Sequence, residues 1–161
     1  MSESAPLLTA HLDGAIRNGR HHMQIRVYYE DTDAGGVAYH ATYLRFAERA
    51  RTEALRDVGI PHAELLQHFT LMFVVRRVEV DYLRPARLDD SLTVVTEMLD
   101  VGGASVLLRQ DVRGPEGSCA ALTVRLACVK PGDGRPGRLP RRWRDALTSM
   151  CQAAQAQEHK E

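Results

Sequence analysis

The chain has 161 residues, of which 44% are hydrophobic and 26% are charged. This length and balance predict one globular domain and argue against several domains or a disordered chain. Lys and Arg number 21, as do Asp and Glu, and a formal net charge of zero argues against a dedicated nucleic-acid-binding protein, whose surface is usually basic.

The sequence shows neither a membrane span nor an export signal. Its longest uninterrupted apolar run, residues 71–75, has five residues, whereas a spanning helix needs about 20. The first residues contain an acid and no apolar core of the kind found in secretory signals. Three cysteines, Cys119, Cys128 and Cys151, lack the spacing of a metal site. We therefore predict reduced thiols, no metal and a cytoplasmic location.

The chain is predicted to form one domain over residues 22–156. Residues 1–21 mix small, polar and charged side chains without a period, and we predict a flexible tail there. Residues 157–161 are predicted to be a short C-terminal tail. Within the domain, the alternating run over residues 23–29 predicts a first strand, and residues 30–40 a polar, glycine-containing loop.

Residues 42–57 carry the clearest helical pattern. Apolar side chains recur at helical spacing along one face, and arginines and a threonine occupy the other. Gly59 and Pro61 follow as stop signals. The alanines on the apolar face predict a helix that packs closely against a sheet. Residues 61–68 can add one or two further helical turns.

The second half of the chain is predicted to be β-sheet. Its four strand candidates are residues 71–83, 91–101, 105–112 and 119–129, and residues 140–155 form a terminal helix. Because no long helix separates these strands, the sheet should be mainly antiparallel. The predicted fold is therefore α+β, with a curved five-stranded sheet around one long central helix. Its open edge favours self-association.

The segment between the first strand and the long helix carries the chemistry. It holds Glu30, Asp31 and Asp33, then Gly35 and Gly36. A carboxylate in such a loop can act as a nucleophile or general base. The glycines allow close backbone approach to a ligand, and the helix start offers free N–H groups for an oxyanion. His40 and Tyr29 could orient a substrate or a water.

A structural interpretation of the same segment stays open from the residues alone. The three acids also suit a surface turn with helix-capping carboxylates, and His40 also suits a structural cap. Calcium binding is disfavoured, because Ala34-Gly35-Gly36 does not continue the pattern of an EF-hand loop.

The sequence resembles a known family in three segments. The run Y-E-D-T-D-A-G-G-V at residues 29–37, followed by Tyr39, His40 and Tyr43, closely resembles the signature of hotdog-fold acyl-CoA thioesterases. It is similar to the 4-hydroxybenzoyl-CoA thioesterase class, and within it to the bacterial family associated with the Tol-Pal system. The resemblance continues in residues 46–53 and 84–90, and covers roughly residues 23–145.

The resemblance implies a fold, a reaction and a set of site residues. The fold would be a hotdog, paired as a dimer or a tetramer with each site at a subunit interface. Acyl-CoA would be hydrolysed without a cofactor, since CoA is part of the substrate. Asp33 would attack the thioester or activate water, with His40 and Tyr29 in support. The N–H groups near residues 38–40 would stabilise the oxyanion. The expected substrate contacts are Gly35, Gly36, Val37, Ala38, Tyr39, Arg84 and Arg138.

A second class of hotdog thioesterases uses a glutamate on the helix, and Glu48 is the candidate here. Its alternative role is an ion pair with Arg45 or Arg51. A non-catalytic module that binds acyl groups or acyl carrier protein is the main alternative function, and a hotdog dehydratase is a third. Residues 125–144 contain seven basic residues and one acid, a surface suited to CoA phosphates or to an acidic carrier protein.

Overall fold

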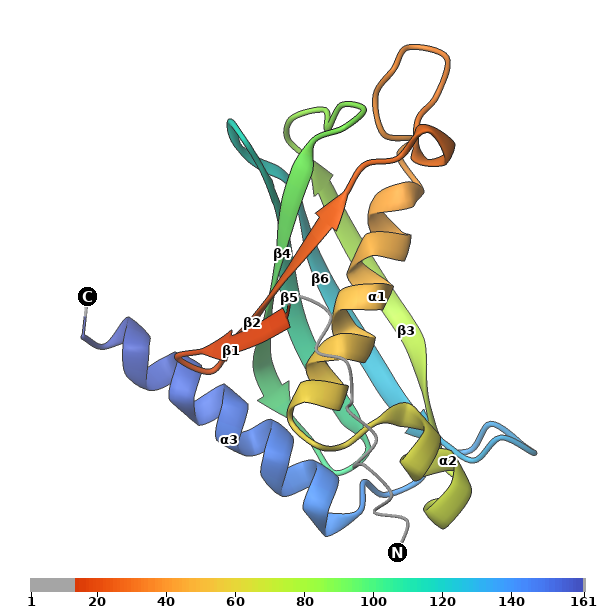
Figure 1. Ribbon diagram of the computed structural model, residues 1–161. Helices are drawn as coiled ribbons and strands as arrows, with labels where there is room; N and C mark the ends of the chain where they lie inside the picture. Colours follow the sequence, from red (N-terminus) through yellow and green to blue (C-terminus); the bar gives the residue numbers. More distant parts are fainter. Residues whose placement is uncertain (1–13, 161) are drawn as a thin grey trace, which may run out of the picture.

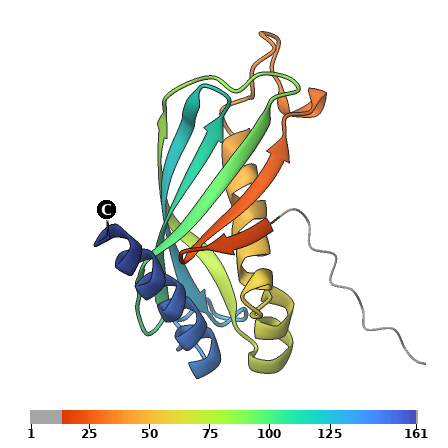
Figure 2. The same ribbon diagram turned by 60° about the vertical axis from the view of Figure 1, so that its left-hand side comes forward.

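The computed structural model describes residues 14–160. Six antiparallel strands form one sheet in the order β1-β2-β4-β5-β6-β3, and the sheet curves around helix α1 (Figures 1 and 2). The strands are β1 (Gly14–Arg17), β2 (Arg20–Arg26), β3 (Met72–Tyr82), β4 (Ser91–Val101), β5 (Ser105–Gly114) and β6 (Gly117–Val129). The helices are α1 (Thr42–Asp57), α2 (His62–Phe69) and α3 (Arg141–Glu158), with a 3-10 turn, η1 (Tyr29–Asp31), before α1.

The prediction of five strands was wrong by one strand. Residues 14–21, which were assigned to a flexible tail, instead form β1 and the start of β2, and residues 1–13 lie outside the described residues. The two strands are joined by Asn18 and Gly19, both with positive φ. Asn-Gly is the preferred pair for such a two-residue hairpin, so the signal was present in the sequence. At the other end, α3 continues through Glu158, into the predicted C-terminal tail.

Helix α1 has the bounds that its periodicity predicts, and it lies inside the curve of the sheet (Figure 1). Ala47, Ala50 and Ala54 have no exposed surface, and their small side chains let the helix backbone approach the strands. Gly59, with a φ of +84°, ends the helix in a left-handed turn that favours glycine. The core therefore forms between the inner face of the sheet and one side of α1.

Helix α3 crosses the sheet near the C-terminal end of α1 (Figure 1). Trp143, Leu147 and Met150 are buried on its apolar side, and Trp143 contacts the ring of Phe69 in α2 at a centroid distance of 5.2 Å. The hairpin turn between β1 and β2 lies against α3, because a Cβ at Gly19 would come within 2.4 Å of the backbone nitrogen of Ala154.

Strand β3 ends the sheet and pairs along one side with β6. A bulge between Val75 and Arg77 shifts the register. Because of this shift, one row of side chains faces the inside of the sheet along the whole strand: Phe73, Val75, Val78, Val80 and Tyr82. Val75 and Tyr82 are half exposed, since α1 lies nearer to β1, β2 and β4 than to β3.

None of the helices within residues 14–160 combines the length and the apolar character that a membrane crossing requires. The three cysteines are buried and unpaired in this part of the chain, and burial raises the pKa of each thiol.

The turn at Gly19 allows a stability test of the β1–β2 hairpin against α3. Gly19→Ala should lower the free energy of unfolding by about 2–4 kcal/mol, because it adds a left-handed backbone cost and a clash with α3. Gly103→Ala is the matched control, since a Cβ there meets nothing within 4 Å, and it should change stability by less than about 0.5 kcal/mol. Urea denaturation of both variants measures the difference, and equal stabilities would contradict the packing of the hairpin on α3.

Candidate active site

The loop between β2 and α1 forms a small hairpin at the N-terminal end of α1 (Figure 1). Thr32 bridges to Ala38, and the N–H of Asp33 donates to the carbonyl of Val37 at 2.9 Å. Gly36 turns the chain with a φ of +76°, a conformation in which other residues are strained. The hairpin therefore presents residues 33–36 to solvent beyond the N-terminal end of the helix.

The structure separates the three acids of this loop. Asp31 is buried, and its Oδ2 accepts the backbone N–H of Tyr28 at 2.8 Å. Its carbonyl accepts the N–H of Tyr39 at 2.9 Å and the hydroxyl of Thr42 at 3.2 Å. Asp31 is therefore committed to holding the loop together. Glu30 and Asp33 are exposed.

Asp33 is held in position and accessible. Its Oδ1 accepts the N–H of Gly35 at 2.8 Å, which fixes the carboxylate relative to the turn. A Cβ at Gly35 would lie 3.2 Å from this same oxygen, a tight contact that glycine avoids. Within residues 14–160, Oδ2 has no hydrogen-bond partner, which leaves one carboxylate oxygen available to a ligand or a water.

His40 and Tyr29 lie on the same loop as Asp33. Tyr29 is in η1 with 83% of its surface exposed. The ring of His40 lies 4.4 Å from that of Tyr39 and 6.4 Å from that of Tyr82. The carbonyl of His40 accepts the hydroxyl of Tyr82 at 2.9 Å. In residues 14–160 no hydrogen bond joins Asp33 to either side chain, so the structure places them at one end of α1 without linking them.

Two of the expected oxyanion donors are already engaged. The N–H of Ala38 donates to the carbonyl of Ala86 at 2.8 Å, and that of Tyr39 donates to Asp31. The N–H groups of Ala38 and Tyr39 are therefore unavailable to an oxyanion, which leaves His40 among the three residues expected to supply donors. Among the described residues, the N–H groups of His40 and Ala41 have no acceptor. These groups lie at the positive end of the α1 dipole.

The segment after β3 supports the loop from the other side. Val37 bridges to Arg87, and the N–H of Leu88 donates to the carbonyl of Gly36 at 3.2 Å. Arg84 lies in this segment, beside a cavity of about 240 Å³ that it lines together with Arg87 and Asp90. Arg84 is therefore at the same end of the sheet as Asp33.

Arg138 lies elsewhere in the molecule. It belongs to the loop between β6 and α3, which Figure 1 places at the opposite end of the sheet from the Asp33 loop. Arg138 lines a surface depression with Arg141 and Arg144 of α3. The structure therefore does not bring Arg138 together with the other predicted site residues of the same chain.

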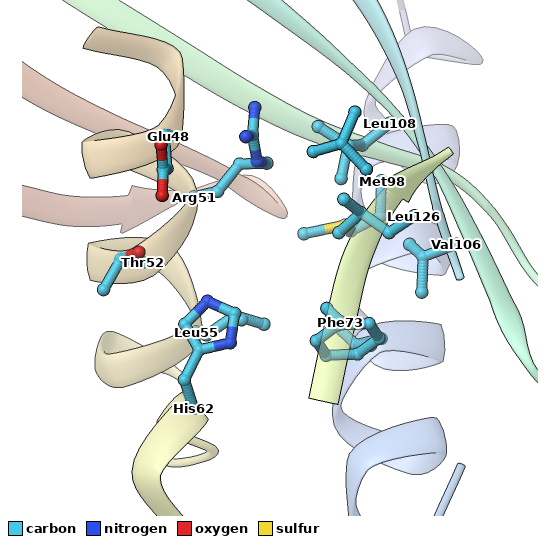
Figure 3. A pocket seen from close by; sticks show the side chains of 12 residues that line it. Glu48, Arg51, Thr52, Leu55, His62, Phe73, Met98, Val106, Leu108 and Leu126 are labelled. Carbon is cyan, nitrogen blue, oxygen red and sulfur yellow. The ribbon is translucent and has the colours of Figure 1, made fainter. Parts of the chain in front are cut away.

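A second cavity, of about 370 Å³, lies between α1 and the inner face of the sheet (Figure 3). Arg51 and His62 line it beside Glu48 and Thr52, and the strands contribute apolar side chains. Burial lowers the pKa of His62, and the charge of Arg51 lowers it further. The sequence pattern suggested only an ion pair with Glu48 for Arg51, and His62 was not among the predicted site residues. The sequence feature that could have indicated this cavity is Arg51 itself. It places a charge on the apolar face of the helix, one turn from Ala47 and one turn from Leu55.

Within residues 14–160, no three His, Cys, Asp or Glu side chains are grouped closely enough to hold a metal ion.

Comparison with known proteins places the chain among thioesterases. Residues 35–121 match the thioesterase superfamily. The acyl-CoA thioesterase YbgC of Haemophilus influenzae is 47% identical over 117 residues, which cover 73% of this chain and 86% of that protein. The acyl-CoA thioester hydrolase YbgC of Escherichia coli O157:H7 is 44% identical over 118 residues, covering 73% and 87%.

Solved structures agree with the fold. A crystal structure from Bartonella henselae matches with a TM-score of 0.71 at 40% identity, and covers 75% of this chain and 99% of that chain. A 1,4-dihydroxy-2-naphthoyl-CoA thioesterase from Synechocystis matches with a TM-score of 0.74 at 18% identity, covering 80% and 96%. The second likeness concerns the fold alone. Together these matches confirm the predicted hotdog fold.

The different surroundings of Asp31 and Asp33 predict different effects on stability. Asp31→Ala leaves the N–H of Tyr28 without its acceptor and empties the buried position of the carboxylate, and it should cost about 1–3 kcal/mol. Asp33→Asn keeps an oxygen for the N–H of Gly35 and should change stability by less than about 0.5 kcal/mol. Thermal unfolding of both variants measures these effects. A larger loss for Asp33→Asn than for Asp31→Ala would contradict this division of roles.

Proposed function

The chain belongs to the thioesterase superfamily, and we propose that it hydrolyses acyl-CoA thioesters to a free acid and CoA. One observation carries the proposal: an exposed carboxylate, Asp33, is held by the loop that leads into α1, and at the start of this helix two backbone N–H groups lack an acceptor among the described residues. Relatives at 44–47% identity named as acyl-CoA thioesterases or thioester hydrolases support the substrate class.

In the reaction, an oxygen attacks the thioester carbonyl and the C–S bond breaks. Asp33 acts in one of two ways. As a general base it takes a proton from water, whose oxygen adds to the carbonyl, and the proton passes to the departing CoA sulfur. As a nucleophile its oxygen forms an anhydride and releases CoA, and water then hydrolyses the anhydride. The free Oδ2 suits either route, and the products are the same.

The developing oxyanion needs fixed hydrogen-bond donors. We assign this role to the N–H of His40, with that of Ala41 beside it, because the N–H groups of Ala38 and Tyr39 are engaged by carbonyls. A single donor of this kind is typically worth about 3 kcal/mol of the barrier in hydrolases. The helix dipole adds to the same stabilisation.

The rest of the loop contacts the substrate in this proposal. A Cβ at Gly36 would meet nothing within 4 Å, so the backbone of the turn is open to a ligand. Gly35, Val37, Ala38 and Tyr39 continue this surface. The side chains of His40 and Tyr29 orient the carbonyl or the attacking water. This role requires them to be accessible to the substrate, and both are exposed in the single chain.

A second copy of the chain completes the site. Among residues 14–160, the inner row of β3 is only partly covered and one edge of β3 pairs with no strand, so this edge can pair with another chain. We propose a homodimer through β3, and dimers can pair further into a tetramer. In this arrangement Arg84 contacts the CoA that is bound beside Asp33 of the same chain. Arg138, at the far end of the sheet, could contact CoA only in another subunit's site.

Other predicted partners stay predictions. Arg138, Arg141 and Arg144 form an exposed basic surface that suits an acidic acyl carrier protein. The association with a Tol-Pal system and the absence of a cofactor are implied by the resemblance alone. A non-catalytic acyl-binding module is the alternative function, and release of free thiol from acyl-CoA distinguishes it from an enzyme.

Glu48 is the weaker candidate for the catalytic carboxylate. It is exposed in the second turn of α1, beyond the first turn, where the N–H groups are still free. A thioester carbonyl beside Glu48 would therefore find no free backbone donors on the same turn of α1.

Asp33→Asn should reduce thiol release from acyl-CoA by about a thousandfold or more, because it removes the only proposed base or nucleophile. Glu48→Gln is the matched control on the neighbouring helix and should keep activity within about tenfold of the parent. The assay uses short, long and aromatic acyl-CoAs with a thiol-reactive dye. Retention of the parent kcat by Asp33→Asn on every substrate cleaved would refute the assignment.

A further inference from the structure

The cavity beneath α1 contains a partly buried positive charge without a carboxylate partner. Arg51 donates from Nη1 to the amide oxygen of Gln110 at 2.8 Å. No Asp or Glu oxygen of residues 14–160 lies within 4.0 Å of its guanidinium. Burial lowers the pKa of Arg51, and the more distant charge of Glu48 opposes this effect. An arginine nevertheless stays protonated in a protein, so the cavity wall carries a cation.

Arg51 occupies a position where the fold would accept an apolar side chain. Ala47 and Leu55, one turn away on either side, are both buried. Protein interiors are close-packed and rarely leave voids larger than a water molecule. The cavity, at about 370 Å³, has far more room than the roughly 30 Å³ that one water occupies in the liquid. The arginine therefore coincides with a space of ligand size.

The guanidinium is held in place by a buried polar network. Gln110 is fully buried, and its Nε2 donates to the carbonyl of Ala47 at 2.8 Å and to Thr96 Oγ1 at 2.9 Å. These bonds fix the amide so that its oxygen faces Arg51. Figure 3 shows Arg51 extending from α1 into the cavity, on the side that faces Leu108. Because a guanidinium has five N–H donors, several remain for a ligand.

A row of inward-facing side chains on β3 runs from the Asp33 loop to this cavity. Tyr82, at one end of β3, bonds to the carbonyl of His40, and Phe73 and Val75, near the other end, line the cavity. Between them Val78 and Val80 face the same side. The Gln110 amide bonds both Arg51 and the carbonyl of Ala47. Ala47 lies seven residues after His40, which corresponds to about 10 Å along a helix axis at 1.5 Å per residue. A hydrocarbon chain with C–C bonds of about 1.5 Å spans it with roughly eight carbons.

We propose that this cavity receives the far end of the acyl group and that Arg51 selects acyl chains that end in a carboxylate. The inference rests on the proposed thioesterase function. Apolar side chains of the sheet, such as Leu108 and Leu126, contact the methylene groups, and Arg51 bonds to the terminal carboxylate. His62, packed edge-on to Phe73 at 6.0 Å, adds a polar ring to the lining. Glu48 is the one carboxylate in the lining, and its exposed charge weakens this selection.

The test compares suberyl-CoA with octanoyl-CoA, which have the same chain length and differ only at the far end. The parent should have the higher kcat/KM on suberyl-CoA. Arg51→Gln, which keeps a donor for Gln110, should lower kcat/KM on suberyl-CoA by about tenfold or more and leave octanoyl-CoA within about threefold. Arg51→Lys should keep most of the preference, and Glu48→Gln should increase it. Equal losses on both substrates in Arg51→Gln, or a parent without the preference, would overturn the inference.

Binding separates this inference from the proposed function. Calorimetry measures the affinity of suberyl-CoA and octanoyl-CoA for Asp33→Asn and for the double variant Asp33→Asn with Arg51→Gln. Because Asp33 is replaced in both, turnover does not affect the measurement. If Asp33→Asn binds suberyl-CoA more tightly than octanoyl-CoA and the double variant does not, the role of Arg51 is supported. This conclusion holds even if the parent cleaves neither thioester and the proposed reaction is wrong. Equal binding of the two esters to Asp33→Asn refutes that role. A thermal unfolding curve for each variant confirms that it is folded.

Discussion

The position of α1 relative to the sheet is the constraint on which the rest of the structure depends. Ala47, Ala50 and Ala54 bring the helix close to the strands along its length. At its C-terminal end, His21 Nε2 and Asp57 Oδ2 lie 2.7 Å apart, and His21 is fully buried. This contact ties β2 to the last turn of the helix. With the helix fixed in this way, its N-terminal end cannot slide relative to the loop that precedes it.

The segment after β3 completes this support at the other end of α1. The hydroxyl of Tyr43, in the first turn of the helix, accepts the N–H of Ala86 at 3.0 Å, and Ala86 in turn accepts the N–H of Ala38. Burial raises the pKa of Tyr43, so the phenol stays neutral. The 84–90 segment, one of the three that carry the family resemblance, therefore acts mainly by holding the Asp33 hairpin. Two distant stretches of sequence are needed to position one carboxylate.

Much of the fold could be predicted from the sequence, because local pattern and tertiary packing agree. The helical period of residues 42–57 and Gly59 gave the bounds of α1, and alternation located the strands of the second half. The Asn18-Gly19 hairpin was missed although its signal is local, because the segment around it has no sustained period. The engagement of the Ala38 and Tyr39 N–H groups, and the cavity at Arg51, could not be predicted. Both depend on strands and loops that are distant in sequence.

The uneven coverage of β3 links the two ends of the proposed site. The alanines hold α1 against the opposite side of the sheet, toward β1, β2 and β4, and this placement leaves Val75 and Tyr82 of β3 half exposed. If α1 packed evenly against all strands, it would bury this row completely. The packing that fixes α1 therefore also leaves this row of β3 partly uncovered. Because apolar surface of this kind favours burial, either an acyl chain or a second copy of the chain would be stabilised there.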